Sequence, residues 1–297
     1  MKRVERIFLG NSLTSNTLAR ENDVIVDIWE GGSDLYGWTL GSSCLDRVPV
    51  FLTRKCCYEI FGEVFEEVDV EVVIEGPESG VREKMGDVDS SFLSFCGRLL
   101  LPERRVCDCY RSFLRKSKAG RVFSPISRID LESKTVKTYH RELEYGELVN
   151  TRPLHYFLTK AGLSDLSSQL TYASAYILVL VGKVGLREFA KMFIGHRGYS
   201  LGLVVSYRET PIGRTVYAFI PFDRKSLRAE LTNRAIAELK RLKVIEEPIV
   251  FLRSFYSKYF RLRSDAKEIG EFLKKHDVLL AGRYGKWSEV SICDICQ

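Results

Sequence analysis

The chain has 297 residues, 45% of them hydrophobic and 28% charged, and a formal net charge of +6. This composition indicates a globular protein with a sizeable core, in one large domain or two closely joined ones. No apolar run approaches the roughly 20 residues that a membrane-spanning helix needs, and no terminal stretch has the pattern of a signal peptide. We therefore expect a cytoplasmic protein without a membrane partner. Its mild positive charge suits an anionic ligand such as a nucleotide, but argues too weakly for us to expect nucleic acid as a partner.

The balance of amide and charged residues indicates the kind of organism that the chain comes from. Glutamine occurs only twice, whereas lysine, arginine and glutamate are abundant. This bias is reported for proteins from very hot environments and predicts a thermophilic source, with lineage composition as the alternative.

The eight cysteines include a Cys-x-Cys at 107–109 and a Cys-x-x-Cys at 293–296. They could share a zinc ion, form a disulfide or stay reduced. We expect no metal, because nothing in the sequence brings the two motifs together.

The first 30 residues have a strand–helix–strand rhythm. A short apolar strand is predicted at 6–10 ("RIFLG"), a helix at 12–22, and an alternating strand at 23–30 that ends on Glu30. Glycine, serine and aspartate are frequent from 31 to 48, which indicates an irregular loop.

Strands dominate the middle of the chain. One is predicted at 69–76, and the short alternating runs between turn residues at 122–151 predict a small antiparallel meander. Between 171 and 222, the runs "TYASAYILVLVG", "SLGLVVSYRE" and "TVYAFIPF" predict the broad sheet of a second region.

The last third of the chain returns to helices. Leucines that recur on one face predict a helix at 223–245, and a second helix at 264–276 has Ser264 as its predicted N-cap. A short strand at 277–282 follows. Strand–helix alternation at both ends, around a sheet-rich middle, indicates a nucleotide domain built from both ends of the chain. We assign 1–60, 120–165 and 245–297 to an FAD-binding type of domain, and 61–119 and 166–244 to a substrate or cap region.

The first predicted turn has the outline of a dinucleotide-binding fingerprint, which uses glycines to bring the backbone close to a pyrophosphate at a helix N-terminus. Its three positions are Gly10, Ser12 and Ser15. The turn glycine is therefore present, and the other two positions hold small residues whose hydroxyls can donate to phosphate. Such a site also has an acidic residue about 20 positions on that binds a ribose hydroxyl, and Glu30 stands there. A purely structural β-α unit with one glycine is the alternative.

Two further glycine motifs accompany this turn. Gly31 and Gly32 follow the predicted acid directly, and "AGRYGKW" at 281–287 follows the last predicted strand. A glycine beside an arginine at the end of a strand lets the backbone approach a ligand while the guanidinium presents charge. A plain turn with a surface arginine is the alternative.

Together these motifs resemble the FAD-dependent amine oxidase and protoporphyrinogen oxidase superfamily, in particular its branch similar to UDP-galactopyranose mutase. In that family a glycine turn, a second-strand acid, a Gly-Gly pair and a late "GR-G-W" stretch occur in this order. The stretch "YGELVNTRPLHYFL" at 145–158 is similar to the family's strand that ends in a Thr-x-Pro-Leu turn, here Thr151, Pro153 and Leu154. The resemblance loosely covers most of the chain. It implies an α/β fold, with an FAD/NAD(P)-binding Rossmann-like domain and a smaller sheet-based substrate domain.

The resemblance also implies FAD as the cofactor of an oxidoreductase that acts on an unknown small substrate. Family members continue into a helix whose N-terminus points at the flavin, so we expect a homo-oligomer or a partner subunit to complete the pocket. The two lost glycines leave open a cofactor-free relative that serves as a binding or scaffolding subunit. The implied positions are Gly10, Ser12, Ser15, Gly31 and Gly32 at the phosphates, Glu30 at the adenosine ribose, Gly282 and Arg283 near the ribityl and pyrophosphate region, and Trp287 close to the flavin ring.

Catalytic residues stay unassigned. The sequence contains no GxSxG, HExxH or Walker motif, and a flavin carries the redox chemistry itself. The stretch "RSFYSKYFRLRS" at 253–264 interleaves basic and aromatic residues, as single-stranded nucleic-acid sites do, but we favour a half-buried strand with solvated charges. In the flavin-family interpretation this strand borders the substrate cavity, and Tyr256 is the candidate substrate residue.

Overall fold

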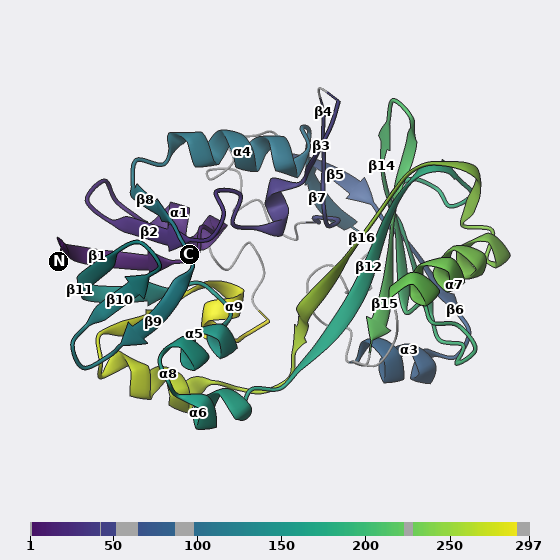
Figure 1. Ribbon diagram of the computed structural model, residues 1–297. Helices are drawn as coiled ribbons and strands as arrows, with labels where there is room; N and C mark the ends of the chain where they lie inside the picture. Colours follow the sequence, from purple (N-terminus) through teal and green to yellow (C-terminus); the bar gives the residue numbers. More distant parts are fainter. Residues whose placement is uncertain (1, 42, 52–64, 87–97, 223–227, 290–297) are drawn as a thin grey trace.

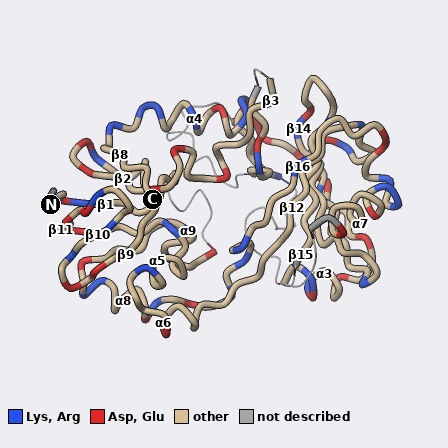
Figure 2. Tube along the Cα trace, in the orientation of Figure 1, with Lys and Arg blue, Asp and Glu red and all other residues tan. Residues whose placement is uncertain are grey.

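The computed structural model describes residues 2–41, 43–51, 65–86, 98–222 and 228–289. Figure 1 shows two bodies, each built on its own sheet, with the long strands β12 (Tyr172–Val184) and β16 (Ile245–Leu262) extending from one toward the other. In the part of the chain that the structure describes, no helix is long and apolar enough to cross a membrane. Lysine and arginine are interspersed with aspartate and glutamate over both bodies (Figure 2).

The first body is a seven-stranded sheet whose parallel strands come from distant parts of the chain. Five strands run parallel, and the other two complete an antiparallel meander with β11. The predicted strand–helix–strand start and the predicted meander are both confirmed. The order is β8 (Gly120–Phe123), β2 (Val24–Asp27), β1 (Lys2–Leu9), β11 (Glu142–Asn150), β10 (Thr135–Thr138) and β9 (Ile126–Asp130), with β17 (Val278–Leu280) beside β11.

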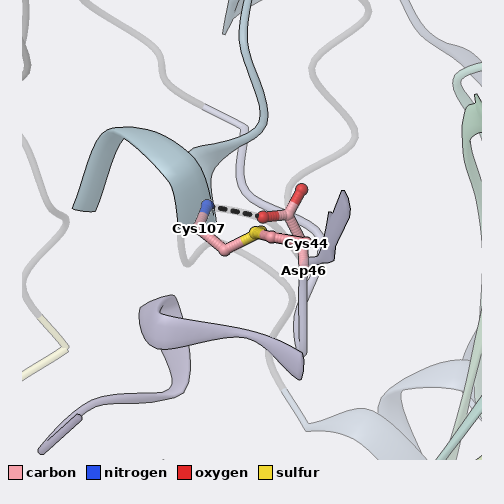
Figure 3. A group of neighbouring side chains, drawn as sticks. All are labelled: Cys44, Asp46 and Cys107. Carbon is pink, nitrogen blue, oxygen red and sulfur yellow. Dashed lines mark hydrogen bonds between the residues drawn. A yellow bond between two sulfur atoms is a disulfide. The ribbon is translucent and has the colours of Figure 1, made fainter. Parts of the chain in front are cut away.

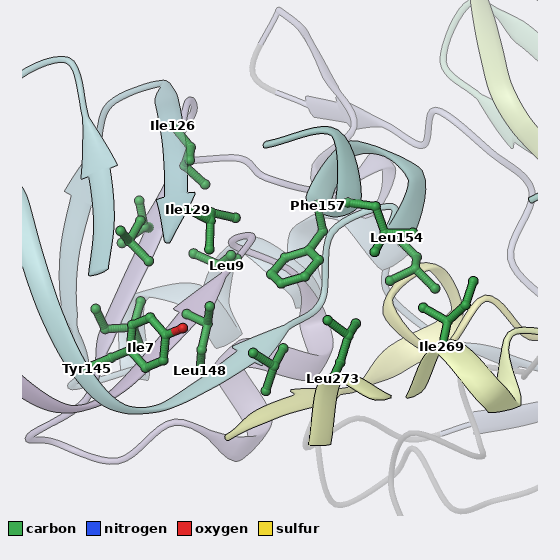
Figure 4. Packing of buried hydrophobic residues seen from close by; sticks show 14 of the residues in the cluster. Ile7, Leu9, Ile126, Ile129, Tyr145, Leu148, Leu154, Phe157, Ile269 and Leu273 are labelled. Atoms are coloured by element: carbon green, nitrogen blue, oxygen red, sulfur yellow. The ribbon is translucent and has the colours of Figure 1, made fainter. Parts of the chain in front are cut away.

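One face of this sheet packs against helices from two separate segments, α5 (Leu154–Lys160) and α8 (Lys267–Lys274). Figure 4 shows Ile7 and Leu148 of the sheet in one cluster with Phe157 of α5. The next residue of β1, Phe8, points to the opposite face and packs in a different cluster. Because the end of β1 is buried on both faces, residues 7–9 are apolar at successive positions, whereas residues 3–5 alternate.

The start of α8 differs from the prediction. Its N-cap is Ala266, which makes no side-chain cap bond, and the predicted N-cap Ser264 lies before it. The Ser264 Oγ accepts hydrogen bonds from the Thr171 N–H at 2.9 Å and from the Trp287 Nε1–H at 3.0 Å. This serine therefore joins three segments of the chain, because two distant donors use the oxygen that could have capped the helix.

The second body is a six-stranded sheet, antiparallel except where its edge strand β6 pairs in parallel with β13. Helix α7 (Arg228–Arg241) covers one face. Along β12, Ile177 and Val179 pack on one face of the sheet, and Leu178 and Leu180 pack on the other, so "YILVLV" is apolar throughout. The order is β16, β12, β15 (Gly213–Phe222), β14 (Leu203–Thr210), β13 (Ala190–Ile194) and β6 (Glu71–Glu75).

The segment 245–262, which we assigned to the nucleotide domain, lies in the second sheet. As β16 it pairs with β12 along almost its whole length, from Ile245 opposite Val184 to Leu262 opposite Tyr172. These backbone hydrogen bonds place it at the edge of the six-stranded sheet, and only the residues after it return to the first body. Its residues from 255 to 262 are part-buried, except for the buried Phe260 and Leu262, which confirms the half-buried strand that we favoured.

A disulfide joins Cys44 of β4 (Ser43–Leu45) to Cys107 in the first turn of α4 (Val106–Lys116), with the two Cα atoms 6.2 Å apart (Figure 3). Both cysteines are buried. The Cys-x-Cys motif thus pairs with a cysteine that the sequence motifs did not include, and the 293–296 motif lies outside the described residues.

Removing this disulfide is expected to lower the free energy of unfolding, because it links residues 63 positions apart. The loop-entropy model gives a loss on the order of 4 kcal/mol for a loop of this length. A Cys44→Ser/Cys107→Ser double variant should melt below the wild type, and dithiothreitol should lower the melting temperature of the wild type only. Circular dichroism melts with and without reductant measure both effects. An equal reductant effect on the two proteins would assign it to other cysteines.

Candidate functional site

The first turn of the seven-stranded sheet has the strand–turn–helix form that the sequence predicts. Gly10 follows β1 with a φ of +102°, a conformation that favours glycine, and Ser12 is the N-cap of α1 (Leu13–Leu18). The Ser12 Oγ accepts from the Ser15 N–H at 3.2 Å, and the Ser15 Oγ accepts from the Ser12 N–H at 2.8 Å. The serines at the two lost glycine positions therefore bond to each other in a capping box.

The acid that ends the second strand is Asp27, three residues before the predicted strand end at Glu30. The buried Asp27 carboxylate accepts hydrogen bonds from the Asn11 N–H at 2.5 Å and the Ile28 N–H at 2.6 Å, and these bonds turn the chain out of the sheet. The Glu30 side chain is exposed and its carboxylate accepts from the Tyr36 hydroxyl at 3.3 Å. Of these two acids, Asp27 has its carboxylate at the turn, and the ribose role of Glu30 stays a prediction.

The Thr-x-Pro-Leu segment lies directly on this turn, because β11 pairs in parallel with β1. The Thr151 hydroxyl donates to the Leu9 carbonyl at 2.9 Å, and the Ser12 hydroxyl donates to Thr151 Oγ1 at 3.0 Å. A Cβ at Gly10 would lie 2.7 Å from Thr151 Oγ1 and 2.8 Å from Arg152 Cγ. The turn glycine is therefore needed for the close approach of the chain's own residues.

Arg152 is a site residue that the sequence motifs did not single out. Its Nη1 lies 3.1 Å from Asp27 Oδ1, and its guanidinium lies 4.5 Å from the ring centroid of Tyr156. The position of Asp27 directly after the apolar run 24–26 was an available signal in the sequence. No local pattern links it to Arg152, which is 125 positions away.

The Gly-Gly pair also closes on the turn. Gly32 has a φ of +56°, and a Cβ there would clash with the Asn11 carbonyl. The same carbonyl accepts a hydrogen bond from the Tyr110 hydroxyl of α4 at 3.3 Å, and burial raises the pKa of Tyr110, so this hydroxyl remains a donor. Gly31 is buried against the side chain of Trp29.

In the late Gly-Arg motif, the glycine packs against α1 and the arginine bonds to the end of β16. Gly282 begins α9 (Gly282–Lys286) with a φ of +70°, and a Cβ there would lie 2.6 Å from Thr14 Oγ1. The Arg283 Nη2 lies 2.8 Å from Glu289 Oε2 and donates to the Phe260 carbonyl at 2.7 Å.

Trp287 is part of the core between the first body and the long strands. It is 1% exposed, and its ring packs edge-on against Tyr172 and Tyr259, with centroids 6.0 and 5.4 Å apart. Tyr256 lies on β16, where its hydroxyl donates to Ser174 Oγ at 2.8 Å. Apart from Glu30 and Gly31, the predicted residues thus form two groups. Gly10, Ser12, Ser15, Gly32 and Gly282 meet around the start of α1, whereas Arg283, Trp287 and Tyr256 lie with β12 and β16.

The first group fits the ADP half of a dinucleotide in part. A turn with a positive-φ glycine and an acid at the end of the second parallel strand are present, as such a site requires. The same edge of the sheet exposes large apolar side chains, and one of them, Phe123, is in register with Asp27. The acid, Asp27, however, already forms an ion pair with Arg152. The exposed apolar residues are Ile28 at 55%, Trp29 at 42% and Phe123 at 44%.

A second group of chemically reactive side chains surrounds the disulfide. Cys44, Asp46 and Cys107 are buried, and each offers one potential metal-ligand atom within 4.8 Å of the others. The two sulfurs are bonded to each other, and the Cys107 N–H donates to Asp46 Oδ1 at 2.8 Å (Figure 3). In this form the sulfurs make a covalent link instead of holding a metal.

No protein-family model matches the chain, and no curated protein matches its sequence. Solved structures nevertheless share its fold. A reduced UDP-galactopyranose mutase superimposes with a TM-score of 0.79 at 11% identity, covering 100% of this chain and 92% of its own. A putative protoporphyrinogen oxidase from Exiguobacterium sp. 255-15 gives 0.74 at 11%, covering 99% and 98%. A variant of putrescine oxidase gives 0.65 at 9%, covering 99% and 97%.

These similarities confirm the predicted resemblance for the fold. The chain shares the α/β architecture of these three proteins, with a Rossmann-like domain and a second, sheet-based domain.

The close contact of residues 151 and 152 with the turn can be tested by Gly10→Ala. We expect a loss of about 2–4 kcal/mol in the free energy of unfolding, from the positive φ and from the clash with Thr151 and Arg152. Gly162→Ala is the matched control, because Gly162 has a φ of +76° and a Cβ there would meet no atom of the described residues within 4 Å. It should lose only the part due to φ, about 1–2 kcal/mol. Equal losses in urea unfolding would contradict the close contact.

Proposed function

We propose that this chain is a flavoprotein that binds FAD, and that it is an oxidoreductase of the amine-oxidase type acting on a small organic substrate. The observation that carries the proposal is the meeting of Gly10, Asp27 and the Thr-x-Pro-Leu segment at the carboxyl edge of the parallel strands. Open α/β sheets bind ligands at this edge, with the pyrophosphate near the first helix N-terminus. The fold shared with putrescine oxidase and a putative protoporphyrinogen oxidase supports the same assignment.

In this proposal the ADP half of FAD lies across the turn. The diphosphate lies at the start of α1, beside Gly10, Gly32 and the serine hydroxyls of the capping box, which can donate to phosphate. We place the adenosine ribose at Asp27 instead of the predicted Glu30, since Asp27 ends the second strand and its carboxylate is at the turn. The adenine packs on the exposed apolar side chains of the same edge, where an aromatic base gains stacking and burial.

The flavin half extends toward β16. Gly282 contacts α1, and Trp287 packs on Tyr259 where the first body meets this strand. Flavin, when bound, supplies the redox chemistry, so the chain has to orient the ring, place the substrate and exclude water. Arg283 is oriented by Glu289 and the Phe260 carbonyl, which holds its guanidinium close to this region. Tyr256 is the residue that we propose on the substrate side.

One observation favours a second function, that of a cofactor-free binding or scaffolding subunit. The polar groups of the turn satisfy one another, through the Ser12–Ser15 capping box and the Asp27–Arg152 ion pair. A site that binds no ligand needs such internal partners, because buried polar groups without partners are costly.

FAD binding by the purified protein separates these two functions. We expect visible absorption from bound flavin, or a rise in melting temperature on adding FAD, because a ligand that binds only the folded state stabilises it. ADP should compete with FAD, whereas riboflavin, which lacks the ADP half, should not. Absence of absorption, binding and thermal shift would favour the cofactor-free subunit.

The position of the adenine can be tested by Phe123→Ala. We expect FAD to bind about tenfold more weakly, because an aromatic surface for a base is lost. The fold should be unaffected, since Phe123 is 44% exposed. Leu252→Ala is the matched control, an apolar residue 39% exposed on β16. Fluorescence titration with FAD compares the two variants, and equal affinities would place the adenine elsewhere.

A further inference from the structure

The side chain of Arg152 lies along the path that a nucleotide would take. It leaves the chain beside Gly10, with its Cγ 2.8 Å from where a Cβ of that glycine would be. Its guanidinium reaches Asp27, 3.1 Å away, at the end of the neighbouring strand. The side chain therefore crosses from the end of β1 to the end of β2. In folds of this kind the diphosphate and the adenosine ribose of a dinucleotide occupy these two places.

The hydrogen-bonding capacity of Asp27 is almost used up. A carboxylate offers about four acceptor positions. The Asn11 N–H, the Ile28 N–H and the Arg152 guanidinium already donate to this one. The adenosine ribose brings two neighbouring hydroxyls, so a ribose held by both has to displace one of these donors. The two N–H groups are fixed in the backbone, whereas Arg152 is a side chain with several rotatable bonds. The guanidinium is therefore the donor that leaves.

The ion pair is well placed to compete with a ligand. The side chains of Arg152 and Asp27 are only 15% and 6% exposed, so water and salt screen the pair weakly. The ring of Tyr156 supports the guanidinium from one side. Opening the pair leaves a buried carboxylate with fewer partners, which is costly. The closed arrangement is thus favoured, and the apparent affinity for a ligand falls with the fraction of open molecules.

We propose that Arg152 holds the nucleotide site closed, and that adenosine diphosphate, free or as part of a dinucleotide, binds only in molecules whose guanidinium has left Asp27. This inference rests on the proposed function for the class of ligand. A closed site explains two features of this turn together. It lies at the sheet edge where nucleotides bind, yet its polar groups already bond to one another.

Arg152→Met is the direct test, because methionine keeps an aliphatic stem against Gly10 and Tyr156 but removes the cation. We expect this variant to bind FAD and ADP about tenfold more tightly than the wild type, since the closed form loses its ion pair. Arg128→Met is the matched control. Arg128 is an exposed residue of β9 in the same sheet, paired with Asp130, and its loss changes the net charge equally. Its affinities should stay within about twofold of the wild type. Fluorescence titration with FAD and calorimetry with ADP measure these values.

Each outcome decides one or both proposals. If the wild type binds FAD and Arg152→Met binds it equally or more weakly, the closed site is overturned and the FAD function stands. Binding by Arg152→Met with none by the wild type supports the closed site and argues against FAD as the native cofactor. No binding of FAD or ADP by either protein overturns both. Should Arg152→Met fail to fold, Arg152→Lys keeps the charge but lacks the planar fork. It is expected to bind more tightly than the wild type, and equal affinity would overturn the closed site.

Discussion

The parallel pairing of β1 with β11 is the constraint on which the candidate site depends. Its register places Leu9 beside Asn150, so that Gly10 and Thr151 leave the sheet together although they are 141 positions apart. Thr151 can therefore bond to the turn, and Arg152 can extend from it to the end of the next strand. The capping box, the buried acid and the glycines of the later motifs are all arranged around this meeting point.

Because of those contacts, the groups that would bind a nucleotide at this sheet edge are already used within the chain. Its glycines are required for close packing within the chain, because Gly32 lies on the Asn11 carbonyl and Gly282 lies on Thr14. Its acid has a cation of the chain as partner. A ligand at this edge has to replace internal bonds, and its net binding free energy is reduced by the bonds that it displaces. The same arrangement thus connects the stability of the fold with the affinity of the site.

Two sets of contacts connect this turn to other parts of the chain. The disulfide holds β4 to the start of α4, and α4 in turn supplies the Tyr110 hydroxyl to the Asn11 carbonyl. On the other side, Trp287 packs between β12 and β16 through Tyr172 and Tyr259. The turn is therefore connected through α4 to the disulfide and through α9 to the aromatic core around Trp287.

The sequence alone determined the strand–turn–helix start, the meander, the main strands of the second sheet and the order of motifs that indicates the fold, because these depend on periodicity and glycine placement within short windows. Only the tertiary structure decided that Asp27 pairs with Arg152, that Ser264 bonds to Thr171 and Trp287, and that β16 belongs to the second sheet. Each of these outcomes depends on strand register and on donors that are distant in the chain. Local propensity does not encode such contacts, since a polar side chain takes whichever buried partner the completed fold brings to it.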